Sequence, residues 1–510
     1  MYDSNHLARR LRAASMGREE APFLIHGLSG EVTSYGRFFA NAERMATALR
    51  RIGVAPGDRV AVQAPKTQVM LELYVACILS GAVFLPLNPA YTAAELRYFL
   101  TDATPVLLVC DPTRLEELGA LASACNLRWI HTIAADETGT LADARDAEVP
   151  GFDPVPRRAN DLAAILYTSG TTGRSKGAML THRALASNSG VLRDCWRFTE
   201  DDVLIHALPI FHTHGLFVAT NVTLMAGGAC IFLPRFDEGP ILDVMPKATV
   251  MMGVPTFYTR LLQQPGLSYA ARNMRLFISG SAPLLAETHA QWQKVTGHAI
   301  LERYGMTETN MNTSNPYDGE RRAGTVGFPL PGVELKICDP ETGVELPQGE
   351  IGMLEVRGPN VFAGYWHMPE KTAQELREDG FFITGDLGRI DEDGYVHIVG
   401  RARDLIISGG FNIYPKEVEA VIDELPGVLE SAVIGVPHPD FGEAVVAVVV
   451  AQEGRSLKEG GILAGLGDRL ARFKHPKRVI LTDALPRNTM GKVQKNALRA
   501  AHAGLFAQEK

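Results

Sequence analysis

Residues 59–111, RVAVQAPKTQVMLELYVACILSGAVFLPLNPAYTAAELRYFLTDATPVLLVCD, alternate short apolar runs with longer helix-like segments. The expected strands and helices are, in order, 59–65, 67–82, 83–88, 92–103 and 105–111. This alternation is typical of parallel sheet whose strands are joined by crossover helices. Buried-strand patterns recur farther along the chain, at 161–167, 248–255, 274–281 and 299–305. We therefore predict an α/β fold that binds its ligands at the carboxyl ends of the strands.

The pattern of apolar and turn-forming residues changes after about residue 325. Short strands separated by Pro and Gly indicate a small antiparallel barrel or sheet. Farther on, strands are expected at 431–438, 443–450 and 477–481, with a helical segment at 463–473, which together make a compact α+β unit of ordinary domain size. We predict an N-terminal domain at 1–400, with mixed and parallel sheets, helices and the barrel-like part, and a C-terminal domain at 401–510. The boundary is expected between Gly400 and Asp404.

Composition excludes several classes of protein. A chain of 510 residues predicts more than one domain, and a net charge of −8 without runs of Lys or Arg gives no support to nucleic-acid binding. Six scattered cysteines without a CxxC pair suggest neither zinc nor disulfides, so we expect a cytoplasmic protein. The N-terminus is expected to be a short amphipathic helix. The longest apolar stretch, from Leu73, is interrupted by Gly81 and two prolines, so no membrane span is expected.

The loop at 168–177, TSGTTGRSKG, follows the buried strand at 161–167 and leads into a helical segment at 181–192. Gly and small hydroxyl residues let backbone N–H groups converge on an anion, phosphate above all, although the same residues also favour a surface turn. A Walker A loop would place Ser or Thr after its Gly-Lys pair. Here Lys176 is preceded by Ser175 and followed by Gly177, so we expect a different kind of phosphate loop.

This loop resembles the phosphate-binding signature of the adenylate-forming superfamily, which includes acyl-CoA synthetases, luciferases and nonribosomal peptide adenylation domains. Further segments resemble the family's motifs, in the family's order. They are SGSAPL at 279–284 (adenine loop), YGMTET at 304–309 (nucleotide and magnesium), TGD at 384–386 (ribose), GRARDLIISGGFNIYPKEVE at 400–419 (hinge and thioester loop) and PRNTMGKVQK at 486–495 (adenylation lysine). The resemblance therefore spans residues 168 to 495.

The resemblance implies an enzyme that uses ATP and Mg²⁺, with CoA as co-substrate. The catalytic residues would be Lys492, Thr168, Glu308 and His212, and Thr168 and Glu308 would hold the Mg²⁺, a cation that prefers oxygen ligands. The implied ATP-binding residues are Thr168, Ser169, Gly170, Thr171, Thr172, Gly173, Lys176, Gly280, Ser281, Ala282, Glu302, Arg303, Tyr304, Gly305, Met306, Thr307, Asp386, Arg401 and Lys492. The plain alternatives are an exposed, salt-bridging Glu308 and a surface Lys492.

The resemblance also implies domain alternation, because Lys492 and the thioester loop lie in the same small domain. Lys492 would serve adenylation, and the domain would then rotate about a hinge at Arg403. Ser408, Gly409 and Gly410 would bind CoA, since a glycine pair allows the pantetheine arm to approach the backbone closely.

Segments such as LPIFHTHGLF at 208–217 and FLPRFD at 232–237 resemble malonyl-CoA synthetases, which implies malonate, with methylmalonate as a further substrate. The alternative is another short or medium-chain carboxylic acid. A second carboxylate must be paired in a closed pocket. Our candidates for the acid pocket are Arg235 first, then His206 and Arg275, with Ser279, Thr256 and Met306. Structural roles remain open for Arg275, where an ion pair is at least as expected, and for His206 and His214.

Other readings of the motifs are a carrier-protein adenylation domain, a luciferase-like oxygenase and a nucleotide-binding pseudoenzyme. We expect small-molecule substrates, no nucleic-acid or membrane partner, and a monomer or weak dimer. A lysine acetyltransferase acting on Lys492 would delete the charge that adenylation uses.

Overall fold

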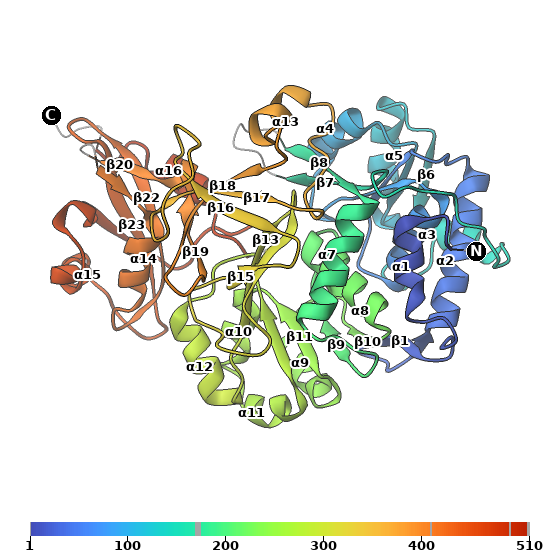
Figure 1. Cartoon of the computed structure of the whole chain (residues 1–510), viewed down its shortest axis with the longest axis horizontal. Coiled ribbons are helices and arrows are strands. Elements are labelled where there is room, and N and C mark those ends of the chain that lie inside the picture. Colours follow the sequence, from blue (N-terminus) through green and yellow to red (C-terminus); the bar gives the residue numbers. More distant parts are fainter. Residues whose placement is uncertain (1, 169–174, 409–410, 489–490, 507–510) are drawn as a thin grey trace.

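The computed structural model describes residues 2–168, 175–408, 411–488 and 491–506. Its chain runs from an α/β part at one end of the molecule to a smaller C-terminal unit at the other (Figure 1). The first sheet has the strand order β6-β5-β3-β4-β7-β8. These strands are β3 (Arg59–Gln63), β4 (Val83–Pro86), β5 (Leu107–Cys110), β6 (Trp129–Thr132), β7 (Leu162–Thr168) and β8 (Lys176–Thr181). Only β8 runs antiparallel to its neighbour.

A second, nine-stranded sheet has the order β15-β14-β13-β12-β11-β9-β10-β1-β2. Its strands are β1 (Pro22–His26), β2 (Val32–Ser34), β9 (Val203–His206), β10 (Ala229–Phe232), β11 (Val250–Gly253), β12 (Leu276–Ser279), β13 (Leu301–Met306), β14 (Asn310–Ser314) and β15 (Phe328–Pro329). The strands from β1 to β13 are parallel in the centre, so the predicted buried strands and their crossover helices are confirmed.

Helices cover and separate these two sheets. They are α1 (His6–Ala13), α2 (Tyr35–Ile52), α3 (Gln68–Ser80), α4 (Ala93–Ala103), α5 (Leu115–Ala124), α6 (Thr140–Asp146), α7 (His182–Cys195), α8 (Asn221–Ala226), α9 (Glu238–Val244), α10 (Pro255–Leu261), α11 (Leu267–Ala270) and α12 (Ala286–Thr296). The main hydrophobic core joins side chains of both sheets with those of α2, α3 and α7. Helix α3 is buried nearly throughout, begins at the N-cap Thr67 and ends at Gly81, whose φ of 73° an L side chain rarely adopts.

The part expected to be barrel-like is a four-stranded antiparallel sheet in the order β16-β17-β18-β19. Its strands are β16 (Glu334–Cys338), β17 (Gly352–Arg357), β18 (Phe382–Ile390) and β19 (Val396–Arg401), and α13 (Pro369–Glu375) lies between β17 and β18 in the chain. Because β19 extends to Arg401, that residue belongs to the same sheet as Asp386, its partner across the hairpin.

The C-terminal unit has its own sheet and hydrophobic clusters. It comprises β20 (Ile406–Ser408), β21 (Phe411–Ile413), α14 (Pro415–Asp423), β22 (Val428–His438), β23 (Gly442–Ala451), α15 (Glu459–Leu466), β24 (Arg478–Thr482) and α16 (Lys495–His502). The expectation of a helix through 463–473 was wrong, because α15 ends at Leu466 and only short 3₁₀ turns follow. Gly465 and Gly467 weaken a helix at that point. Among the described residues, no helix is both long and apolar enough to cross a membrane.

Candidate active site

The phosphate loop connects two antiparallel strands, since Thr168 at the end of β7 lies opposite Lys176 at the start of β8. Helix α4 supports this hairpin: the Tyr98 hydroxyl donates to the Ser175 carbonyl at 2.7 Å, and the Tyr167 hydroxyl donates to Asp102 at 2.5 Å. The candidate ATP-binding residues Ser169, Gly170, Thr171, Thr172 and Gly173 lie outside the described residues. Both ends of the loop are thus fixed at the carboxyl end of β7.

Thr168 and Glu308 come together as the sequence motifs suggest. The Thr168 hydroxyl donates to Glu308 Oε1 at 3.4 Å, and burial raises the pKa of the Glu308 carboxyl. Within the described ranges no group of three His, Cys, Asp or Glu side chains is placed to hold a metal ion. A buried carboxylate and a hydroxyl nevertheless suit Mg²⁺, which usually takes its remaining ligands from phosphate and water.

Asp386 and Arg401, the candidate ribose-binding residues, form an ion pair. Arg401 Nε lies 2.6 Å from Asp386 Oδ1, and the Tyr304 hydroxyl donates to Asp386 Oδ2 at 2.5 Å. All three side chains converge because β18 and β19 form a hairpin whose end meets β13. Asp386 keeps carboxylate oxygens that accept hydrogen bonds, as binding of ribose hydroxyls requires.

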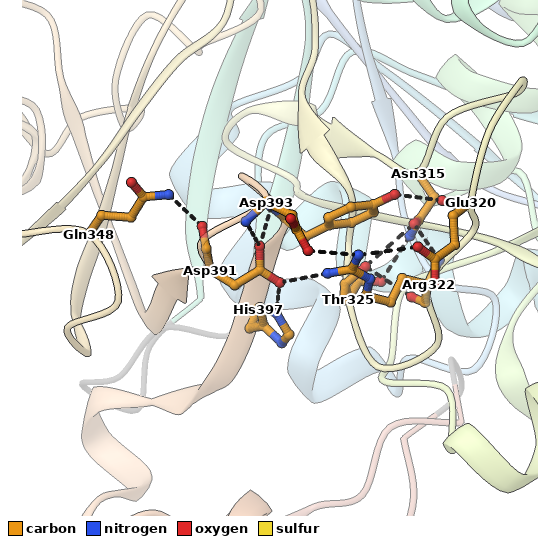
Figure 2. Close-up of polar contacts among 9 residues, drawn as sticks. Asn315, Glu320, Arg322, Thr325, Gln348, Asp391, Asp393 and His397 are labelled. Atoms are coloured by element: carbon orange, nitrogen blue, oxygen red, sulfur yellow. Dashed lines mark hydrogen bonds and ion pairs between the residues drawn. The ribbon is translucent and has the colours of Figure 1, made fainter.

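A network of hydrogen bonds and ion pairs connects the β18–β19 hairpin to the segment that follows β14 (Figure 2). Asp391, in the turn between β18 and β19, binds His397 Nε2 at 2.8 Å and Arg322 Nη1 at 3.2 Å. The backbone N–H of Arg322 donates to Asn315, whose amide group donates to the Glu302 carbonyl of β13 at 3.1 Å. The network therefore fixes the β18–β19 hairpin relative to the strand that carries Tyr304.

Lys492 lies close enough to Arg401 and Asp386 for their charges to act on its ammonium group. Its side chain is exposed, but the surrounding protein lowers the pKa of its ammonium group, as does Arg401, while Asp386 raises it. The preceding Gly491 faces Thr256 of α10, since a Cβ on Gly491 would lie 3.4 Å from the Thr256 hydroxyl. Ser408, by contrast, is a buried residue at the end of β20. Gly409 and Gly410 lie outside the described residues, and Arg403 is in the 3₁₀ turn Ala402–Asp404 that joins β19 to β20.

His212 lines a small cavity together with Asn88, Tyr167 and Thr307. The cavity has a volume of about 20 Å³, enough for one water molecule. Burial lowers the pKa of His212 to about 4, so its imidazole is neutral at pH 7. His212 can therefore donate or accept a hydrogen bond here, but it brings no charge.

The candidates for the second carboxylate lie in different surroundings. Arg275 precedes β12, at the end opposite the SGSAPL loop, and its Nε and Nη2 atoms bind the two carboxylate oxygens of Asp202 at 2.7 Å each. His206 uses both ring nitrogens within the protein: Nε2 lies 2.9 Å from the Gly215 carbonyl and Nδ1 lies 3.2 Å from Lys66 Nζ. Arg275 and His206 therefore have partners within the protein in this structure. Arg235 is exposed and forms no ion pair with another described residue.

Three buried side chains, on β12, on β13 and at the start of the π-helical segment His214–Thr220, offer unpaired polar atoms instead. They are Nε and Nη2 of Arg303, Nε2 of His214 and Oγ of Ser279, none of which has a hydrogen-bond partner among the described residues. Arg303 is 4 % exposed, and burial lowers the pKa of its guanidinium group to about 9. The guanidinium group packs directly on Gly280, where a Cβ would lie 2.3 Å from Arg303 Cζ. We call this set the Arg303 cluster.

Sequence motifs indicate part of the Arg303 cluster. They predict Ser279 in the acid pocket and Arg303 at the nucleotide, and they do not decide the role of His214. Position next to a motif does not reveal whether an arginine has a carboxylate partner in the fold. A buried cation with free N–H donors is suited to binding an anion.

Comparisons with known proteins agree with this geometry. The family model of AMP-binding enzymes matches residues 11–366, and that of the AMP-binding enzyme C-terminal domain matches residues 417–492. A malonate–CoA ligase of Arabidopsis thaliana is 34 % identical over 556 residues, covering 98 % of this chain and 91 % of the relative. A feruloyl-CoA synthase of an Amycolatopsis species is 38 % identical over 479 residues, covering 93 % and 94 %.

The crystal structure of ATP-bound MatB from Rhodopseudomonas palustris is 59 % identical, covers 99 % of both chains and superimposes with a TM-score of 0.96. The apo form of that protein has a TM-score of 0.85 at the same identity and coverage. The first family model matches well over half of the chain, and the model of the C-terminal domain matches the part that follows. These matches establish the family. The chain belongs to the family of AMP-binding enzymes.

Proposed function

We propose that this protein is a malonate–CoA ligase, which joins malonate to CoA while ATP is cleaved to AMP and pyrophosphate. The observation that carries the proposal is the Arg303 cluster, a buried cation with unpaired donors beside the adenine loop. Similarity to a malonate–CoA ligase and to ATP-bound MatB supports it. Methylmalonate, which adds one methyl group, is proposed as a further substrate.

In the first half-reaction a carboxylate oxygen of malonate attacks the α-phosphorus of ATP, and pyrophosphate leaves with the electrons of the broken P–O bond. Negative charge gathers on the phosphoryl oxygens and the leaving group. We assign Lys492 to stabilise that charge, because its ammonium group is within electrostatic reach of Asp386 and Arg401, the proposed ribose ligands. Lys176 would bind the β- and γ-phosphates from β8. Mg²⁺ held by Thr168 and Glu308 would neutralise phosphate charge when bound.

In the second half-reaction the thiolate of CoA attacks the acyl carbon of malonyl-AMP, and AMP leaves with its phosphate oxygen. Ser408, with the neighbouring residues 409 and 410, is our candidate for guiding the pantetheine arm. Rotation about Arg403 would bring this hairpin to the site. His212 and Met306 would border the acyl group, and the half-buried Met306 side chain would limit its length.

The Arg303 cluster explains preference for a dicarboxylate. A monocarboxylic acid would leave the guanidinium group of Arg303 buried and unpaired, whereas the second carboxylate of malonate would accept from Nε and Nη2. Charge-assisted, two-point hydrogen bonds of this kind are the strong ones in proteins. Selection of the acid thus depends on the charge of Arg303 rather than on exposed Arg235.

The test is AMP release with malonate, methylmalonate, succinate, acetate, octanoate and ferulate as acids. We expect malonate to give the highest kcat/KM, with methylmalonate second. Turnover of octanoate or ferulate without turnover of malonate would overturn the proposal in favour of a ligase for another acid. A cytoplasmic location, a monomeric or weakly dimeric state and acetylation of Lys492 stay predictions of the sequence.

A further inference from the structure

The segment before α13 runs beside the strand that follows the phosphate loop. The backbone N–H of Met179 donates to the Gly364 carbonyl at 3.0 Å, and that of Trp366 donates to the Gly177 carbonyl at 2.8 Å. Residues 363–366 thereby add to the edge of β8. This pairing places α13, and Glu375 at its end, next to Lys176.

Glu375 holds the ammonium group of Lys176 with both carboxylate oxygens. Lys176 Nζ lies 3.2 Å from Oε1 and 3.1 Å from Oε2, and it also lies 4.0 Å from the centre of the Tyr365 ring. The side chains of Lys176 and Glu375 are 8 % and 19 % exposed. Solvent therefore screens this pair less than it screens surface ion pairs. An ammonium group has three N–H donors, so one donor remains beyond the two that Glu375 accepts.

Tyr365 connects this ion pair to the candidate metal ligand. Its hydroxyl lies 2.6 Å from Glu375 Oε2 and 3.1 Å from Glu308 Oε1. Glu308 in turn accepts from Thr168 at 3.4 Å. A continuous chain of contacts therefore runs from Thr168 through Glu308, Tyr365 and Glu375 to Lys176, around both ends of the phosphate loop.

We propose that Glu375 is a positioning residue for adenylation, which fixes the ammonium group of Lys176 in the place where it meets the phosphates of ATP. Lysine has a flexible four-carbon stem, and holding it in one geometry before ATP binds removes an entropic cost from the reaction. Lys371, one turn earlier in α13, also contacts Glu375 at 2.8 Å and keeps this carboxylate near the loop. The inference rests on the proposed adenylation of an acid by ATP.

The experiment compares wild type with Glu375→Gln, Lys176→Met and the double variant. Glu370→Gln is the matched control, because Glu370 is an exposed carboxylate at the start of the same helix. Malonate-dependent exchange of pyrophosphate into ATP gives kcat and KM for ATP, and single-turnover conversion of synthetic malonyl-AMP with CoA gives the second half-reaction. Wild-type exchange with malonate tests the proposed function independently of Glu375.

We expect Glu375→Gln to lower kcat/KM for ATP about tenfold and to leave thioester formation within about twofold of wild type. Because Glu375 acts through Lys176, the double variant should be no slower than Lys176→Met alone. Glu370→Gln should match wild type in both assays. Independent, multiplicative effects of the two substitutions, or equal losses in both half-reactions, would assign Glu375 a merely structural role.

Discussion

Replacing Arg303 with Met should change activity and stability in opposite directions. Met is neutral and has a similar length, so Arg303→Met removes the buried charge while filling much of the same space. In the wild-type protein without substrate, the guanidinium group is 4 % exposed and two of its nitrogen atoms have no partner among the described residues. This buried charge lowers the stability of the free enzyme, and it gains a favourable interaction only when an anion binds.

The loss of malonate activity should be large. Removing one partner of a buried, hydrogen-bonded charge pair costs about 2 to 5 kcal/mol, which corresponds to a decrease of about 30-fold or more in kcat/KM for malonate. The kcat/KM for butyrate, an acid without the second carboxylate, should stay level or rise. Because we assign Arg303 to the acid rather than to the nucleotide, KM for ATP should change by no more than about twofold.

Stability without ligand should increase. Replacing even a buried ion pair by well-packed apolar side chains is often neutral or stabilises proteins by about 1 to 4 kcal/mol, and here the buried charge has no partner to lose. Arg275→Met is the matched control, because Arg275 has a carboxylate partner in Asp202 at 2.7 Å. That substitution leaves Asp202 without its cation and should destabilise the protein without changing the choice of acid.

Steady-state kinetics on malonate and butyrate, combined with denaturant unfolding of both variants, distinguish a role of Arg303 in acid binding from a purely structural role. Arg303 does not bind the second carboxylate if Arg303→Met keeps kcat/KM for malonate within about threefold of wild type. The same conclusion holds if Arg303→Met destabilises the free enzyme while malonate and butyrate lose activity in the same proportion. In that case Arg303 would have a purely structural role, and exposed Arg235 would again be the first candidate for the clamp.

Two further predictions concern the C-terminal unit and the pH dependence of stability. Lys492→Ala should slow malonate-dependent pyrophosphate exchange by about 100-fold or more. Single-turnover assays should show that thioester formation from synthetic malonyl-AMP is nearly unchanged. Equal losses in the two half-reactions would count against the role assigned to Lys492. Burial lowers the pKa of His182 to about 4, so the folded state binds fewer protons than the unfolded state between pH 6.5 and 4. The wild type should therefore lose about 3 kcal/mol more than His182→Gln as pH falls through that range, and parallel stability curves by urea unfolding would contradict this.

Local sequence patterns predicted most of the fold because they report burial along one element. The alternation at 59–111 identified β3, α3, β4, α4 and β5, and Gly81 marked the turn between α3 and β4. The segment at 463–473 misled because its Leu and Arg spacing suits a helix, while Gly467 at a φ of 32° ends it early. The spacing of apolar residues alone therefore did not predict where α15 ends.

Contacts among the candidate nucleotide-binding residues were predictable from the sequence, and the surroundings of the acid-pocket candidates were not. Thr168, Glu308, Asp386 and Arg401 occur in short motifs, and the fold brings them together at strand ends. The residue type alone does not distinguish Arg235, Arg275 and Arg303. What distinguishes them is whether each is exposed, paired with Asp202 or buried without a partner, and those properties depend on residues far away in the chain.

The contacts between β13 and the C-terminal unit bear on how the enzyme changes state. Lys416 of α14 donates from Nζ to the Ile398 carbonyl of β19 at 3.0 Å, across the turn that contains Arg403. Its charge also lowers the pKa of Glu302 in β13, a pKa that burial otherwise raises. Rotation about Arg403 would remove both interactions and would draw Lys492 away from Asp386. Glu302 would then lose its nearby cation, so the rotated state needs compensation from another source. We therefore expect these contacts to favour the orientation in which Lys492 lies near Asp386 until bound CoA stabilises the rotated one.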